Sequence, residues 1–234
     1  MSTVSVVLPT YNERDNIVPL IQAILLHAQH PTEVWVVDDD SPDGTWQVVQ
    51  EMAARDPRVH LLRRVGERGL TSAIAAGIAA SQGDVVVWMD CDFSMPPEVV
   101  PQLAAALDEA DVAVGSRYVR GGRDVGHSGM ARAFSWGINL FASLLLGWGV
   151  RDYTSGFIAA RREVLTRIPL RGDYGEYCID LLYRAQKAGY RVVEIPYTCV
   201  ERASGESKTG ANVLDYLRRG WKYIWTVLRL RLGR

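Results

Sequence analysis

The sequence predicts an α/β fold with a mainly parallel sheet and helices on both faces. Short apolar runs that fit buried strands alternate with segments of helical length and periodicity. Three of the runs end in acid-bearing turns, and ligands of open α/β sheets collect at the carboxyl ends of strands. The chain has 234 residues, 48% of them hydrophobic and 23% charged, so it can bury a full core. It shows no repeat, low-complexity tract or linker, and we expect residues 1–234 to form a single domain.

The first two runs end in polar turns. Residues 4–8 lead into Pro9-Thr10-Tyr11-Asn12-Glu13, and residues 33–37 lead into the three consecutive acids Asp38, Asp39 and Asp40. The segment that follows, Ser-Pro-Asp-Gly-Thr, is typical of a turn that leads into a helix. Three adjacent carboxylates repel one another, so stability alone does not explain them.

The third run, residues 85–89, continues directly into Asp90-Cys91-Asp92. Carboxylates at the end of an apolar strand are costly unless they are neutralised, and a hard divalent cation on a phosphorylated ligand does this well. Alternatively, both acids are solvated and cap the helix expected to begin near residues 96–98. Two acids one residue apart are weak evidence alone, but three acid-bearing strand ends favour a shared site.

Two later segments have the composition of membrane-surface helices. Residues 133–150 contain no charge and are flanked by Arg132 and Arg151. A helix over 131–150 that lies in the interface fits this marginal hydrophobicity; a transmembrane helix or a buried core helix are the alternatives. Residues 211–232 interleave basic side chains with Trp, Tyr and Leu, which favours contact with anionic lipid, packing on the domain, or both. Neither segment resembles a nucleic-acid-binding module.

The cysteines and histidines predict no site of their own. Three Cys, at 91, 178 and 199, are too few and too scattered for a disulfide framework or a zinc site. The four His follow no metal or triad spacing, and we expect His127 to be a loop residue. Because Met1 leads into a strand pattern without a basic leader, we expect a cytosolic protein that is not secreted. A net charge of −1 says nothing about partners.

Five motifs stand in order at compatible spacing: VVLPTYNE, VVDDDSPDGT, MDCDFS, GSRYVRGG and DYTSGF. Together they resemble the family-2 glycosyltransferases of the GT-A fold, and most closely the dolichol-phosphate and polyprenol-phosphate mannose synthases. The resemblance implies transfer of mannose from GDP-mannose to a polyprenyl (dolichyl) phosphate, with inversion and with Mg²⁺ or Mn²⁺. It also implies a peripheral enzyme at the cytoplasmic face of a membrane, with or without a membrane subunit.

The resemblance assigns roles on the donor side. Asp90 and Asp92 would hold the cation, with Ser94 acting through water because some relatives have Gln there. Asp40 stands where many relatives have Gly, which leaves the division of roles between Asp38 and Asp39 open. The expected donor-binding set is Pro9, Tyr11, Glu13, Val37, Asp39, Asp90, Cys91 and Asp92.

On the acceptor side the site needs positive charge for two anionic groups. We expect Arg117 to meet the acceptor phosphate, and Arg132 with Ser135 to present a guanidinium and a hydroxyl near the lipid. Each Arg could instead be solvated at the surface or form a salt bridge. The remaining candidates are Arg202 and Lys208, beside a turn that could close on the diphosphate, and Asp152 as an acceptor-side catalytic residue with Asp92 and Arg117.

The predicted chemistry needs no protein nucleophile. A phosphate monoester has its second pKa near ~6, so the acceptor is largely dianionic at neutral pH and can attack without a general base. Three rival functions remain: the same fold with UDP-glucose or another sugar nucleotide, a nucleotidyltransferase, and a non-catalytic lipid-binding module. Nucleotidyltransferases usually have a glycine-rich phosphate loop after the first strand, and residues 9–16 contain no glycine.

Overall fold

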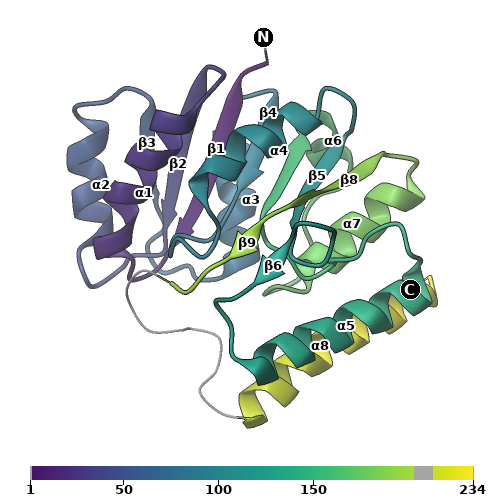
Figure 1. The fold of residues 1–234 in the computed structure, drawn as a ribbon. Coiled ribbons are helices and arrows are strands. Elements are labelled where there is room, and N and C mark those ends of the chain that lie inside the picture. The colour runs from purple at the N-terminus through teal and green to yellow at the C-terminus, as the bar shows by residue number, and fades with distance from the viewer. Residues whose placement is uncertain (1, 203–212, 234) are drawn as a thin grey trace.

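A computed structural model describes residues 2–202 and 213–233, the latter without the side chains of 213–219. The α/β prediction is confirmed (Figure 1). Within the described part of the chain, seven strands form one sheet in the order β3-β2-β1-β4-β7-β5-β8. Their bounds are β1 Val4–Thr10, β2 Thr32–Asp38, β3 Val59–Arg63, β4 Val85–Trp88, β5 Val112–Ser116, β7 Ile158–Arg161 and β8 Val192–Pro196.

The strands that carry the acid-bearing turns run in the same direction. β1 pairs in parallel with both β2 and β4, so their carboxyl ends meet at one edge of the sheet. β7 is antiparallel to β4 and to β5. A second, two-stranded sheet pairs β6, Arg123–Asp124, in parallel with β9, Thr198–Cys199. The predicted meeting of the three turns at one edge therefore follows from the topology.

Helices cover both faces of the large sheet, and alternate strand residues supply the two cores. Val6 and Leu8 pack under the first group of helices, whereas Val7 packs under the second. Gly77 allows close packing on this second face, since a Cβ there would lie 2.4 Å from a Val7 methyl group. The first group is α1 Arg14–His27, α2 Thr45–Ala53 and α4 Val100–Ala106, with a 3₁₀ turn Pro97–Val99 before α4; the second is α3 Leu70–Ala80, α6 Arg162–Arg167 and α7 Tyr177–Lys187.

Two long helices, α5 Gly129–Leu146 and α8 Val213–Arg231, lie side by side along one side of the domain (Figure 1). Gly220 permits this contact, because a Cβ there would lie 2.3 Å from the Phe134 ring. α8 is also fastened to α7 by an ion pair of 3.1 Å between Arg229 Nη2 and Asp180 Oδ1. Both helices are amphipathic, with buried Ile138, Ala142 and Val227 on their inner sides.

The first of these helices ends earlier than the sequence predicted. We expected residues 131–150 to be helical, but α5 stops at Leu146, where Gly147 takes a positive φ of 117°. The predicted helix over 211–232 corresponds to α8, and its first two residues lie outside the described ones. Among the helices that the structure describes, none is both long enough and apolar enough to cross a membrane.

Candidate active site

A cleft of about 780 Å³ opens at the carboxyl edge of the sheet. Residues from all three acid-bearing turns line it, together with residues of the loops after β5 and β9. The structure therefore brings together most of the predicted site. The predicted residues that line the cleft are Pro9, Tyr11, Glu13, Asp39, Asp90, Cys91, Asp92, Ser94, Arg117 and Arg202.

The acids after β2 divide their roles. Asp38 is fully buried and accepts hydrogen bonds from the hydroxyl groups of Thr10 (2.8 Å) and Ser41 (2.6 Å), so it holds the first two turns together. Asp40 points away from the cleft and pairs with Arg63 on the surface. Asp39 lines the cleft and is the acid available to a ligand. Of the three acids, Asp39 is therefore the one placed to meet a ligand in the cleft.

Asp39 is supported by an arginine that the sequence analysis missed. Arg64 Nε donates to Asp39 Oδ1 over 2.7 Å, and the Arg64 side chain is only 5% exposed. The other Asp39 oxygen accepts the backbone N–H of Gly69 over 2.9 Å, where the chain takes a positive φ of 142°. Arg64 also donates to the Gly69 carbonyl over 3.1 Å. Arg64 follows β3 at the same sheet edge, which is the signal that could have revealed it.

Tyr11 also has an unpredicted partner. The Arg68 guanidinium lies 4.4 Å from the centre of the Tyr11 ring, and both residues line the cleft. A stacked aromatic and guanidinium present a flat, cationic surface to a nucleotide.

At the end of β1, the Cys91 thiol donates to the Pro9 carbonyl over 3.4 Å, and this contact joins the first turn to the third. Cys91 thus has a structural contact at the cleft wall.

The acids after β4 form a hard oxygen donor set. Asp90 is exposed to the cleft, and Ser94 donates its backbone N–H to Asp92 Oδ1 over 3.0 Å. The other Asp92 oxygen accepts from Arg202 Nη2 over 2.8 Å, so a positive group already lies against this carboxylate. Two carboxylates and a hydroxyl group suit Mg²⁺ or Mn²⁺, which prefer oxygen ligands and take the rest from phosphate and water. The residues present therefore fit the expected cation.

Arg117 is the cation on the other side of the cleft. Its side chain is only 8% exposed, and its Nε and Nη2 donate in bidentate fashion to Asp152, each over 2.9 Å. Burial alone would lower the pKa of Arg117, but the Asp152 carboxylate outweighs it and raises that pKa well above its ordinary value. Asp124 lies 3.4 Å from Nη1. Arg117 therefore stays charged and holds one orientation.

Helix α5 completes the surroundings of Arg117. Arg117 Nη2 donates to Thr154 Oγ1 over 2.9 Å and to Ser135 Oγ over 3.4 Å. Asn139, one turn further along α5, donates to the same Thr154 oxygen over 2.9 Å. These hydrogen bonds link α5 directly to Arg117 and to its partner Thr154.

Four predicted site residues within the described part of the chain do not line the cleft. Val37 is fully buried in the core beneath α3, because its side chain points to the opposite face from Val36. Asp152 is fully buried and does not line the cleft, but it contacts two residues that do, Arg117 and Thr154. Ser135 acts in the same indirect way. Arg132 is exposed and donates to the Asp124 carbonyl over 3.0 Å. Lys208 lies outside the described residues.

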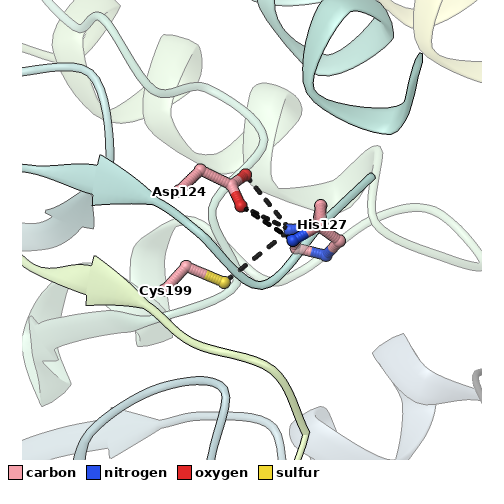
Figure 2. A group of neighbouring side chains, drawn as sticks. All are labelled: Asp124, His127 and Cys199. Carbon is pink, nitrogen blue, oxygen red and sulfur yellow. Dashed lines mark hydrogen bonds and ion pairs between the residues drawn. The ribbon is translucent and has the colours of Figure 1, made fainter. Parts of the chain in front are cut away.

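A group of side chains that the sequence did not connect lies beside Arg117. Asp124, His127 and Cys199 converge from β6, the loop after it and β9 (Figure 2). His127 Nδ1 lies 2.9 Å from Asp124 Oδ1, and this bond, aided by the Cys199 sulfur, raises the pKa of His127 to about 10. His127 and Cys199 line the cleft. Their separation of 72 residues explains why spacing did not reveal them.

Comparison with known proteins identifies the family. Residues 5–168 match the family described as "Glycosyl transferase family 2". The chain belongs to this family. It is therefore a glycosyltransferase, as its motifs implied.

Three curated relatives are similar over most of the chain. The undecaprenyl-phosphate mannosyltransferase of Micrococcus luteus is 39% identical over 97% of this chain and 98% of its own length. The polyprenol monophosphomannose synthase of Mycolicibacterium smegmatis is 44% identical over 90% of this chain and 82% of its own. The dolichol-phosphate mannosyltransferase of Pyrococcus furiosus is 40% identical over 92% of this chain, which spans 62% of that protein.

Solved structures confirm the GT-A-like fold. The glucosyl-3-phosphoglycerate synthase of Mycobacterium tuberculosis, in complex with Mn²⁺, UDP and its product, superimposes with a TM-score of 0.71 at 25% identity. The match covers 99% of this chain and 80% of that one. A second complex of that enzyme, with Mn²⁺, UDP and phosphoglyceric acid, gives a TM-score of 0.72. The neighbours thus include metal-bound and nucleotide-bound glycosyltransferases.

Proposed function

We propose that this enzyme transfers mannose from GDP-mannose to a polyprenyl phosphate, releasing GDP and inverting the anomeric centre. The observation that carries the proposal is the cleft itself, in which the acids after β2 and β4 face a buried arginine on the opposite side. The three curated relatives, each named for mannosyl transfer to a polyprenyl phosphate or for a polyprenol-linked mannose, support the choice of sugar and acceptor.

The donor would bind across the first two turns. Asp39, held by Arg64 and the Gly69 amide, presents a carboxylate that can accept hydrogen bonds from the base or the ribose. Tyr11 and Arg68 supply a flat surface beside it. Glu13 lines the same part of the cleft, and its backbone N–H donates to Thr45 over 3.0 Å, which fixes its position.

Asp90, Asp92 and Ser94 would hold Mg²⁺ or Mn²⁺ against the diphosphate. When bound, the cation neutralises the charge that develops on the leaving diphosphate. Arg202 now lies 2.8 Å from Asp92, close to the same place. Its guanidinium would turn to the diphosphate oxygens once the carboxylate is occupied by the metal.

The acceptor phosphate would bind on the Arg117 side. Arg117 is charged and pre-oriented, so it can fix a phosphate without the entropy cost of ordering a long side chain. A phosphate oxygen then attacks the anomeric carbon, the bond from this carbon to the diphosphate oxygen breaks, and the diphosphate leaves with the electron pair. Because the attacking group is already an anion, no side chain has to remove a proton.

The paired helices α5 and α8 would rest on the membrane surface that holds the acceptor. Large apolar side chains on and beside them are more than half exposed: Met130, Trp136, Leu144, Trp148, Trp221, Trp225 and Leu232. Trp side chains favour the headgroup level, and the exposed Lys222 and Arg231 suit anionic lipid. Peripheral docking at the cytoplasmic face, as the sequence predicted, would bring the phosphate to Arg117.

Turnover with defined substrates tests the proposal. The purified enzyme is given polyprenyl phosphate in vesicles, Mn²⁺ or Mg²⁺, and in turn GDP-mannose, UDP-glucose and UDP-mannose, and the released nucleotide is measured. We expect GDP release that requires both the lipid phosphate and the metal. Turnover with a UDP-sugar alone would contradict the mannose donor.

A second candidate keeps the reaction type but uses UDP-glucose. It is favoured by the glucosyl-3-phosphoglycerate synthase complexes, which contain UDP and share the fold at 25% identity. The higher identity of 39–44% to the mannose enzymes makes it the less favoured donor. The same donor panel distinguishes the two.

A further inference from the structure

We propose that Asp124, His127 and Cys199 form a second metal site, selective for Zn²⁺ or a similar thiolate-binding ion, beside Arg117. Among the described residues, their ligand atoms all lie within 4.8 Å of one another (Figure 2). This site is separate from the oxygen donors of Asp90, Asp92 and Ser94, and it does not depend on the identity of the donor or acceptor.

The spacing of the three ligand atoms fits a small ion between them. His127 Nδ1 lies 2.9 Å from Asp124 Oδ1 and 3.7 Å from Cys199 Sγ. Zinc bonds of about 2.0–2.3 Å in tetrahedral geometry separate neighbouring ligand atoms by about 3.3–3.6 Å. The two sides that meet at His127 therefore need adjustments of only a few tenths of an ångström, and the third side, between Asp124 and Cys199, is at most 4.8 Å. The His127 loop can supply these, since its side chain is 46% exposed.

The backbone already fixes two of the ligands. Asp124 and Cys199 are paired residues in the parallel ladder of β6 and β9. The Val125 and Gly126 amides also donate to the Cys199 carbonyl, over 2.9 and 3.0 Å. A side chain at Gly126 would overlap the Val200 carbonyl, so the loop that carries His127 stays tight against β9. The ligands are therefore held by a ladder and a close turn.

The chemical types of the three ligand atoms determine which metal ion the site prefers. A thiolate, an imidazole and one carboxylate suit Zn²⁺ or Co²⁺, whereas Mg²⁺ and Mn²⁺ prefer the oxygen ligands of the first site. Three protein ligands leave one position of a tetrahedron for water or a substrate oxygen. Cys199 and His127 line the cleft, so this position can be reached by solvent. On binding, the Cys199 thiol releases its proton to solvent.

The positive charge of Arg117 would repel a metal ion bound by Asp124, His127 and Cys199. Its Nη1 lies 3.4 Å from Asp124 Oδ2, whereas His127 contacts Oδ1 most closely. Asp124 can therefore offer Oδ1 to the metal and keep Oδ2 for Arg117. Asp152 already pairs with Arg117 through two hydrogen bonds, which reduces the repulsion.

Cobalt spectroscopy on the full chain tests the site. Metal-free protein is titrated with Co²⁺ alone and then with Zn²⁺ as a competitor. We expect one equivalent of Co²⁺ to produce a sulfur-to-cobalt charge-transfer band with intense visible bands, which report tetrahedral thiolate coordination. Zn²⁺ should abolish both. The variants are Cys199→Ser and His127→Gln, with the matched controls Cys178→Ala and His27→Gln, and Asp92→Asn to remove the oxygen site.

The charge-transfer band should disappear in Cys199→Ser, and the affinity should fall by about tenfold or more in His127→Gln. Both controls and Asp92→Asn should keep the band. The proposal is overturned if the unmodified protein gives no such band, if the band survives in Cys199→Ser, or if Asp92→Asn removes it. Should Cys199→Ser fail to fold by circular dichroism, the unmodified protein and His127→Gln still decide the outcome.

Discussion

The two sides of the cleft are built in different ways. On the proposed donor side, Asp39, Asp90 and Asp92 stand just after β2 and β4, and short turns place them at the cleft. On the proposed acceptor side, Arg117 is positioned by Asp152 and by partners from α5 and β6. A strand end can thus place an acid locally, whereas a buried cation needs partners from distant parts of the chain.

Replacing Asp92, a proposed metal ligand, should impair the proposed donor side most severely. Asp92→Asn keeps the shape but removes the charge, so we expect kcat to fall by about 10²–10³-fold, in line with the loss of one electrostatic group at the reacting centre. Turnover assays across a Mn²⁺ titration measure this. The control is Asp40→Asn, which changes an acid that pairs with Arg63 outside the cleft. Unchanged turnover in Asp92→Asn would contradict the role of Asp92 as a metal ligand at the reacting centre.

On the acceptor side, the corresponding change is Asp152→Asn. It removes the closer of the two carboxylates that the structure places against Arg117 and leaves Asp124 at 3.4 Å, and breaking a buried pair costs about 3–5 kcal/mol. We expect a lower free energy of unfolding in urea and a higher KM for the lipid phosphate. Asp56→Asn, which loses an exposed pair with Arg58, should change stability little. Equal free energies of unfolding for the two variants would contradict a stabilising role of the Arg117–Asp152 pair.

A subtler change separates donor binding from chemistry. Arg64→Gln removes the charge that holds Asp39, and we expect KM for the sugar nucleotide to rise by about tenfold while kcat changes less. Steady-state kinetics at saturating lipid phosphate gives both values. Arg63→Gln is the matched control, because this neighbour pairs with Asp40 and Trp46 on the surface. A larger effect in the control would mean that Asp39 does not face the donor.

The smallest effect is expected at the membrane surface. Replacing Trp136 and Trp225 by Ser removes two large apolar side chains that are 58% and 57% exposed. We expect vesicle binding to weaken by about tenfold while turnover on a detergent-dispersed acceptor stays close to normal. Sedimentation with anionic vesicles measures this, and Leu26→Ser, an exposed change on α1, is the control. Equal sedimentation of both variants would contradict docking through α5 and α8.

The sequence predicted the donor side more fully than the acceptor side for a physical reason. Parallel strands bring their carboxyl ends together, so Asp39, Asp90 and Asp92 could be grouped from strand patterns alone. Asp152 was assigned to catalysis because spacing cannot show that its carboxylate is buried against Arg117. The Val37 side chain does not line the cleft, because it packs in the core beneath α3.

Long-range contacts account for what was missed. Arg64 reaches Asp39 across 25 residues, and Cys199 meets His127 across 72. No local pattern marks either contact, since both depend on how strands are ordered in the folded sheet. The end of α5 was also predicted too late in the chain. A glycine inside the apolar run, Gly147, terminates this helix.

Helix α5 has one more consequence. Its inner side carries Ser135 and Asn139, which contact the partners of Arg117, and its outer side carries Trp136 and Leu144. If the outer side rests on lipid as proposed, a single rigid rod sets the height of the guanidinium above the bilayer. The rate of turnover would then depend on how deep the acceptor phosphate lies in the bilayer. Two acceptors of the same chemistry whose phosphates lie at different depths would react at different rates.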